Sequence, residues 1–482
     1  MKTELNPRRW WALALLSAAQ FLVILDTSII GIALPDIQDA LGFSSSSLQW
    51  VFNAYVIAFG GLLLLGGRLS DLLGARRVFV AGFVLLTASS LLAGLAWSDG
   101  VLVAGRSFQG FGAALIAPSA MAIVLGLFTT PAELGKAMAI WGASAPAGGT
   151  AGVFLGGVIT EWISWRWTFL INVPVALLVL AAVPALLPAA AARRRGRVDV
   201  AGALSVTAAL SLTVYTTVTA NDVGWGSAQT LALYAVALGL FVGFLAIESR
   251  RVEPLVRLGI FRTHNLAGAN AVMALLGAAW IPMWFFLNLY LQQVRGYDAF
   301  EGGLALLPMT VAIMVLMVGV TGRLVARYGF KPPMIAGLSL LAAGIALLAR
   351  VPADGSFLID VLPASLVAAT GMSLAYIPVL IAALSSAKPE EAGLASGLIN
   401  TSYQVGSALG LAAMTAVATS LTTGRLADGA EQATALTDGF QRAFIGAATI
   451  AVLAVIAAAV AITRPRPAAA EVPEAPPVRE AA

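Results

Sequence analysis

The chain has 482 residues, of which 59% are hydrophobic and only 11% are charged, and its mean hydropathy is +0.90. Soluble domains carry roughly 25% charged residues, so this composition excludes an ordinary soluble protein. The absence of cysteine excludes disulfides, thiolate catalysis and cysteine-ligated metal sites. The net charge of +4 indicates basic loops beside a membrane, and no nucleic-acid partner is expected.

Apolar segments of about 18 residues or more, the length that crosses a bilayer as a helix, recur along the chain. They predict an all-α polytopic membrane protein. Its fourteen expected spans are residues 10–34, 48–66, 78–97, 101–127, 137–160, 167–187, 200–220, 228–247, 265–291, 302–322, 333–350, 357–384, 395–420 and 443–463. The first span is too long for a signal peptide and no A-x-A site closes it, so no cleavable leader is expected.

Lysine and arginine are concentrated in alternate loops. If the N-terminus is cytoplasmic, the inner segments carry 22 of the 28 basic residues and the outer segments carry 5. Cytoplasmic loops are enriched in these residues, so both termini are expected on the inner side of the plasma membrane. The remaining basic residue is Arg106, which lies within a predicted span, as the acidic residue Asp26 does.

Asp26 and Arg106 are the only charges expected deep in the membrane. By helical rise, Asp26 lies about 12 Å and Arg106 about 9 Å from the outer ends of their spans. An intramembrane charge costs roughly 2.5–3.5 kcal/mol, so it rarely lacks a function. Helix packing could bring the two together, and a moving arginine or an arriving substrate would then switch the carboxyl between its protonated and ionised states. The alternative is a static ion pair that only fixes helix packing.

A basic loop pattern occurs twice, at residues 67–77 after the second span and at residues 322–331 after the tenth. Two six-helix halves repeated in parallel would place the second copy after the eighth span, so two helices are inserted. The predicted domains are an N-terminal six-helix bundle, a linker with the two extra helices, a C-terminal six-helix bundle and a disordered cytoplasmic tail. They cover residues 1–187, 188–263, 264–463 and 464–482.

Six short patterns occur in a fixed order: Leu25–Ile30, Trp50–Tyr55, Gly67–Arg77, Ala104–Gly110, Trp165–Pro174, and Gly393–Gly397 with Asn400, Gln404 and Gly406. In this order, over about residues 10–463, the chain resembles the fourteen-helix drug:proton antiporters of the major facilitator superfamily. The resemblance implies the major facilitator fold and proton coupling through Asp26 and Arg106. It further implies export of amphiphilic drugs or a natural product by alternating access, without a cofactor.

The resemblance also implies two moving parts. One is an inner-loop conformational latch of Gly67, Arg68, Asp71, Gly74, Arg76 and Arg77; the alternative for these residues is a topology signal and a helix cap. The other is a helix-five packing hinge of Ser144, Gly148, Gly152 and Gly156. Small residues at this spacing also allow close helix packing without any hinge. The chain departs from the family at Val153, where the family has proline, and at Leu72, where it has arginine. The first departure weakens the inference of export, and the second suggests a weaker inner charge network.

Aromatic and amide side chains follow one face of the ninth span. Because amides facing lipid are costly, this face is expected to line an interior substrate cavity. The candidates are Trp280, Trp284, Asn288 and Gln292, joined by Asn53, Tyr55, Gln109, Asn400, Tyr403 and Gln404. For each residue alone, helix–helix hydrogen bonding is an equal alternative. As a set they predict a large, amphipathic, mostly uncharged pocket; His264, the only histidine, is expected at the surface without a role.

The sequence limits which energy source can drive transport and how large a substrate gradient that source sustains. No G-x-x-x-x-G-K-S/T loop is present, so ATP is not expected to drive the cycle. One proton crossing about 100 mV yields roughly 2.3 kcal/mol. With a modest pH difference it sustains very roughly a hundredfold gradient of a neutral substrate. Neutral, zwitterionic or singly charged amphiphiles are therefore expected, with dications disfavoured, and the protein is expected to be a monomer.

Two other functional classes compete with export. A proton-coupled uptake symporter of a small organic solute would use the same scaffold, and the missing proline leaves it open. A membrane-embedded enzyme would need clustered acids, histidines or metal ligands, and the sequence has no H-E-x-x-H or aspartate-rich pair. An enzyme and a metal site are therefore not expected.

Overall fold

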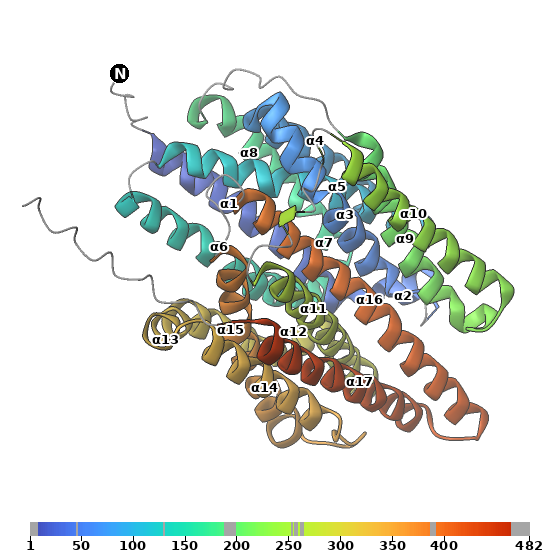
Figure 1. The fold of residues 1–482 in the computed structure, drawn as a ribbon. Helices are drawn as coiled ribbons and strands as arrows, with labels where there is room; N and C mark the ends of the chain where they lie inside the picture. Colours follow the sequence, from blue (N-terminus) through green and yellow to red (C-terminus); the bar gives the residue numbers. More distant parts are fainter. Residues whose placement is uncertain are drawn as a thin grey trace, which may run out of the picture.

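The computed structural model describes residues 8–44, 47–128, 131–187, 199–251, 254, 259–260, 265–385 and 392–463. All regular structure in these ranges is helical (Figure 1). The predicted tail 464–482, the linker residues 188–198, 252–253, 255–258 and 261–263, His264 and the side chain of Asp71 lie outside what is described. The two membrane sides are called inner and outer here as the lysine and arginine distribution predicts them.

The first half of the chain forms α1 (Arg9–Ser28), α2 (Ile30–Leu41), α3 (Trp50–Leu73), α4 (Ala75–Gly94), α5 (Asp99–Leu127), α6 (Pro131–Trp162), α7 (Trp167–Leu170) and α8 (Asn172–Leu186). A hairpin follows, made of α9 (Val200–Val223) and α10 (Ala228–Arg250). The second half forms α11 (Leu266–Leu289), α12 (Ala299–Leu316), α13 (Gly322–Tyr328), α14 (Lys331–Leu348), α15 (Leu362–Leu384), α16 (Ala392–Ala427) and α17 (Gln432–Ala461). π-Helical turns extend α11 and α12 and precede α15, at Tyr290–Val294, Met317–Thr321 and Phe357–Val361.

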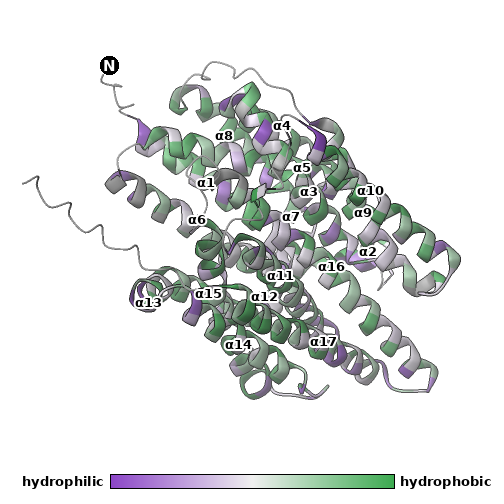
Figure 2. Cartoon of the chain, in the orientation of Figure 1, coloured by the Kyte–Doolittle hydropathy of each residue, from purple (hydrophilic) through white to green (hydrophobic). Residues whose placement is uncertain are grey.

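The protein is a multi-pass membrane protein. In the described residues, eleven helical segments are long and apolar enough to cross a bilayer. Helices α3 and α9 contain the shorter apolar stretches Trp50–Leu63 and Ala201–Thr217, and α6 is 32 residues long. A helix therefore lies at each predicted span, which fits the count of fourteen. Hydrophobic residues recur along all the long helices in Figure 2, as expected for helices that cross a bilayer.

The helices pack as two groups that meet along two seams. In the first group α5 packs against α3 and α4, and α1 packs against α6; in the second, α14 packs against α15, and α11 against α16 and α17. One seam joins α6 to α12, and the other joins α3 to α16. The inserted helix α9 contacts both α3 and α16, whereas α10 packs mainly on α9, so the hairpin lies beside the second seam (Figure 1).

The repeated loop pattern has the same backbone role in both halves. Gly74 separates α3 from α4 with φ +93°, and Gly329 separates α13 from α14 with φ +75°. Residues with a Cβ rarely adopt such angles, so glycine allows the chain to reverse there between consecutive helices. The internal repeat read from the sequence therefore corresponds to two equivalent turns on the inner side.

Candidate functional site

The two intramembrane charges lie in contact inside the first bundle. Arg106 Nη1 on α5 is 2.7 Å from Asp26 Oδ2 on α1, and neither side chain has any exposed surface. Burying two charges is costly, and only good pairing with further hydrogen bonds offsets the cost. The structure thus brings together two residues that are 80 positions apart in the chain.

Two amides complete the shell around the carboxylate. Gln109 Nε2 donates to Asp26 Oδ1 over 3.0 Å, and Asn172 Nδ2 donates to the same oxygen. Gln109 Nε2 also donates to Ser90 Oγ over 2.8 Å, which ties α4 into the network. The roles of Asn172 and Ser90 were not predicted from the sequence. Asn172 was visible as an amide in an apolar span, whereas Ser90 gave no signal, because serine is common in such helices.

Arg106 is held by more than its ion pair. Its Nε donates to the carbonyl oxygen of Val51 over 2.9 Å, and its Nη1 also donates to Gln109 Oε1 over 2.8 Å. The guanidinium carbon lies 4.4 Å from the centre of the Tyr55 ring, within the range of a cation–π contact. The arginine therefore keeps several partners if the carboxylate becomes protonated.

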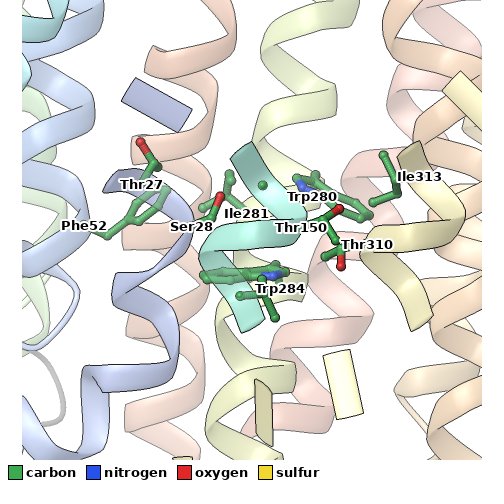
Figure 3. Close-up of a pocket in the computed structure, with 11 residues that line it drawn as sticks. Thr27, Ser28, Phe52, Thr150, Trp280, Ile281, Trp284, Thr310 and Ile313 are labelled. Atoms are coloured by element: carbon green, nitrogen blue, oxygen red, sulfur yellow. The ribbon is translucent and has the colours of Figure 1, made fainter. Parts of the chain in front are cut away.

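A separate cavity of about 150 Å³ lies between the two bundles (Figure 3). Its walls come from α1, α3, α6, α11 and α12. They combine hydroxyl groups, indoles and apolar side chains: Thr27, Ser28, Phe52, Gly149, Thr150, Val153, Trp280, Ile281, Trp284, Thr310 and Ile313. None of these lining residues is ionisable. Asp26 adjoins Thr27 in the chain but points away from the cavity, into the first bundle.

The predicted cavity residues separate into several places. Trp280 and Trp284 line the cavity. Three others lie elsewhere in this structure: Tyr55 and Gln109 surround the ion pair, and Asn53 is buried with its Nδ2 donating to Gln49 Oε1 over 3.2 Å. Amides avoid lipid, but each bundle has its own interior, and hydropathy does not distinguish that interior from the cavity.

The remaining candidates also lie outside the cavity lining. Asn288 is buried and accepts a hydrogen bond from Gln292, which also bonds the first bundle on the outer side. On α16, Gln404 lies against Gly60 of α3, and Tyr403 packs edge-on against Tyr376 with ring centres 5.7 Å apart. Asn400 is half-buried on the same helix. Gln404 therefore lies at the α3–α16 seam, whereas Tyr403 packs against α15.

The small residues of α6 face α1. A Cβ at Gly148 or Gly152 would lie 2.6 or 2.8 Å from atoms of α1, and a Cβ at Gly156 would lie 2.6 Å from the carbonyl oxygen of Ile29, just after α1. Glycine is therefore needed for this close approach. Ser144 instead donates to the carbonyl oxygen of Trp141 over 2.6 Å. Val153 lines the cavity, and α6 runs unbroken through it.

The inner-loop residues flank the turn at Gly74. Gly67 and Arg68 are half-buried on α3, Arg76 is half-buried on α4, and Arg77 is exposed. Because the side chain of Asp71 is not described, its ion pairs stay a prediction. Among the described residues, no group of three or more histidine, aspartate or glutamate side chains is placed to hold a metal ion.

The sequence matches the family described as the Major Facilitator Superfamily over residues 16–411. The chain is 37% identical over 449 residues to the puromycin resistance protein pur8 of Streptomyces alboniger, covering 93% of this chain and 89% of that protein. It is 37% identical over 461 residues to the cephamycin export protein CmcT of Amycolatopsis lactamdurans, covering 94% and 93%. The human organic anion transporter MFSD10 shares the fold, with a TM-score of 0.65 at 15% identity, covering 94% of this chain and 100% of that chain. The resemblance inferred from the motifs is confirmed, and the chain belongs to the major facilitator superfamily.

Proposed function

We propose that this protein is a proton-coupled antiporter that exports amphiphilic drugs or a natural product from the cytoplasm by alternating access. Two relatives that match nearly the whole chain are named for puromycin resistance and cephamycin export. The structural observation that carries the proposal lies on α1. One turn of this helix places Asp26 in a buried ion pair and Thr27 and Ser28 in the wall of a cavity between the two bundles.

Protonation of Asp26 would remove the negative charge that holds three helices together. In its ionised form the carboxylate accepts hydrogen bonds from Arg106 of α5, Gln109 of α5 and Asn172 of α8. Charge-assisted hydrogen bonds of this kind are about twice as strong as neutral ones. Their loss would free α1 to move, and α1 carries part of the cavity wall. Since the carboxylate has no exposed surface here, proton exchange takes place in another conformation of the cycle.

The lining of the cavity supports a substrate class. Hydroxyl groups of Thr27, Ser28, Thr150 and Thr310 offer hydrogen bonds, and the indoles of Trp280 and Trp284 offer apolar and cation–π surfaces. Without an ionisable group in the lining, a doubly charged cargo would lose its hydration without a counter-charge. The proposed substrates are neutral, zwitterionic or singly charged amphiphiles.

The proposed setting is a monomer in the plasma membrane, with both termini in the cytoplasm and no cofactor. Cells with and without the protein would be compared in a drug-susceptibility panel that includes puromycin, with and without a protonophore. We expect resistance that disappears when the proton gradient collapses. Resistance that persists without the gradient would contradict proton coupling.

The direction of transport is tested with ethidium, a fluorescent monocation. Energised cells that carry the protein should exclude the dye, and the protonophore should abolish the difference from control cells. Faster accumulation in energised cells would instead establish the alternative, a proton-coupled uptake symporter of a small organic solute. A protein with Asp26→Asn serves as the control that lacks the coupling acid.

A further inference from the structure

We infer that the side chain of Trp284 is the outer gate of the cavity as well as part of its wall, so that bound cargo touches the gate itself. This inference rests on the alternating access of the proposed function. Its test measures the accessibility of the cavity and requires no efflux, so the two can fail separately.

The indole of Trp284 occupies the space above a glycine of the opposite bundle. A Cβ built on Gly31 of α2 would lie 1.9 Å from Cη2 and 2.4 Å from Cζ3 of Trp284. Real Cβ atoms do not approach other heavy atoms so closely, so only glycine accepts the ring at this position. Trp284 belongs to α11 and Gly31 to α2, so the contact crosses from one bundle to the other.

The position of this contact defines one end of the cavity. Ser28 lies about one turn inward of Gly31 along the chain, and Trp280 lies one turn inward of Trp284 on α11. Figure 3 shows the Trp284 ring lying across one end of the group of labelled side chains. The indole therefore separates the hydroxyl-lined part of the cavity from the outer side.

A neutral hydrogen-bonded layer lies outward of the indole. Gln292 Nε2 donates to the carbonyl oxygen of Ile32 over 3.1 Å, and Gln293 Nε2 donates to Gln38 Oε1 over 3.1 Å. Both glutamines come from the π-helical turn that extends α11. These contacts hold α2 against the second bundle, which keeps Trp284 seated on Gly31.

The contacts of this gate are uncharged. A charged group does join the two bundles elsewhere on the outer side: Glu161 Oε2 accepts from the backbone N–H of Ala299 at the α6–α12 seam. The charge of Asp26 therefore does not act on the Trp284 gate through a shared ion pair. A cargo molecule that stacks on the indole does contact the gate, and a ligand shifts a conformational equilibrium by its differential contacts with the two states.

The absence of native cysteine makes the gate directly testable. A single reporter, Thr310→Cys, places a thiol in the cavity wall, and a membrane-impermeant methanethiosulfonate reagent is added outside intact cells. Combining the reporter with Gly31→Ala should speed labelling by about tenfold or more, because the added methyl overpacks the closed gate. The matched control is Gly149→Ala, a cavity glycine whose Cβ would have no neighbour closer than 3.8 Å, and it should label as the reporter alone.

A second pair of variants keeps the inference falsifiable if Gly31→Ala fails to accumulate. Trp284→Ala should also speed labelling of the reporter, whereas Trp280→Ala, which removes an equal volume from the same wall, should not. In the double variant Gly31→Ala with Trp284→Phe, the smaller ring makes room for the methyl, so labelling should slow again. Two results would each overturn the inference. One is that the reporter in the Gly31→Ala variant is labelled no faster than in the Gly149→Ala variant. The other is that the reporter in the Trp284→Ala variant is labelled no faster than in the Trp280→Ala variant.

Discussion

The interior of the first bundle contains an ion pair, whereas the interior of the second uses neutral partners. Asp26 and Arg106 are fully buried between α1 and α5, while no charged side chain of α11 to α17 is buried among the described residues. The polar contacts of the second bundle include Ser402 Oγ donating to Asn270 Oδ1 over 2.7 Å and Tyr290 Oη donating to Pro352 O over 2.7 Å.

This difference suggests a division of labour between the halves. A buried charge whose partner can change responds to protons, whereas neutral hydrogen bonds and aromatic rings do not respond to pH in the physiological range. The first bundle would then handle the proton, and α11 of the second bundle would supply Trp280, Trp284 and the outer glutamines. The segment α1–α2 touches both systems, since it carries Asp26, the cavity residues Thr27 and Ser28, and Gly31.

The largest expected effect comes from Asp26→Asn. We expect loss of the proton-driven substrate gradient, very roughly a hundredfold for a neutral cargo, because a single coupling acid carries it. Expression and membrane insertion should remain intact. The control is Asp36→Asn, an exposed acid on α2 that should leave efflux unchanged. If the Asp26→Asn protein exports its substrate as well as the unmodified protein does, this carboxylate takes no part in the mechanism. The first bundle would then have no special role in handling the proton.

A smaller effect on stability is expected when an amide side chain is removed, and it should be larger for an amide that bonds a charged group than for one with neutral partners. Asn172→Ala removes a hydrogen bond to the Asp26 carboxylate and should cost about 1.5–3 kcal/mol of stability, the range for bonds to charged groups. Asn270→Ala removes neutral hydrogen bonds in the second bundle and should cost about 0.5–1.5 kcal/mol. Thermal unfolding of both variants in one detergent makes the comparison. Equal losses would show that the charge adds nothing to this network.

Overpacking between helices of the first bundle should lower stability by a comparable or smaller amount than the loss of the Asn172 hydrogen bond. Gly152→Ala places a Cβ 2.8 Å from Ser28 Cβ and 3.0 Å from Leu25 O on α1, and should cost about 1–3 kcal/mol through overpacking. Gly142→Ala on the same helix meets no atom within 4 Å and should be neutral or slightly stabilising. The midpoints of thermal unfolding decide between them. A Gly152→Ala protein as stable as Gly142→Ala would mean that α1 and α6 separate readily.

The fold was predictable because lipid imposes a minimum length and an apolar composition on each helix. The pairing of Asp26 with Arg106 followed from depth, since both residues lie at a similar distance from the outer ends of their spans. The depth of a residue in its span does not tell in which direction around the helix axis its side chain points. For this reason the roles of Asn172 and Ser90 were not predicted, and Gln109 was assigned to the cavity. Gly31 had no signal at all, because the role of a glycine depends on the partner that it admits.

The stripe on the ninth span shows a second limit. Trp280, Trp284, Asn288 and Gln292 do share a helical face, yet the two tryptophans line the cavity while the two amides lie outward of it. Four positions at this spacing extend for about 18 Å along a helix, more than one cavity of this size occupies. A common face therefore predicts a common direction and does not predict a common site.

The smallest expected effect concerns an exposed ion pair in the second bundle. Arg425 Nε lies 2.8 Å from Asp438 Oδ2, with the two side chains 52% and 26% exposed. Solvent screens such a pair, so Arg425→Gln should change stability by less than about 1 kcal/mol. Thermal unfolding checks this value. A loss as large as that of Asn172→Ala would show that charges outside the first bundle also matter.

The inserted hairpin has both of its ends in one place. Asp199, which precedes α9, and Glu248, near the end of α10, both lie against Gly202, since a Cβ there would be 3.0 Å from Asp199 Oδ2 and 2.5 Å from Glu248 Oε1. A segment that enters and leaves at the same point leaves the direction of every later helix unchanged. Such a module can be gained or lost during evolution without turning the second half upside down.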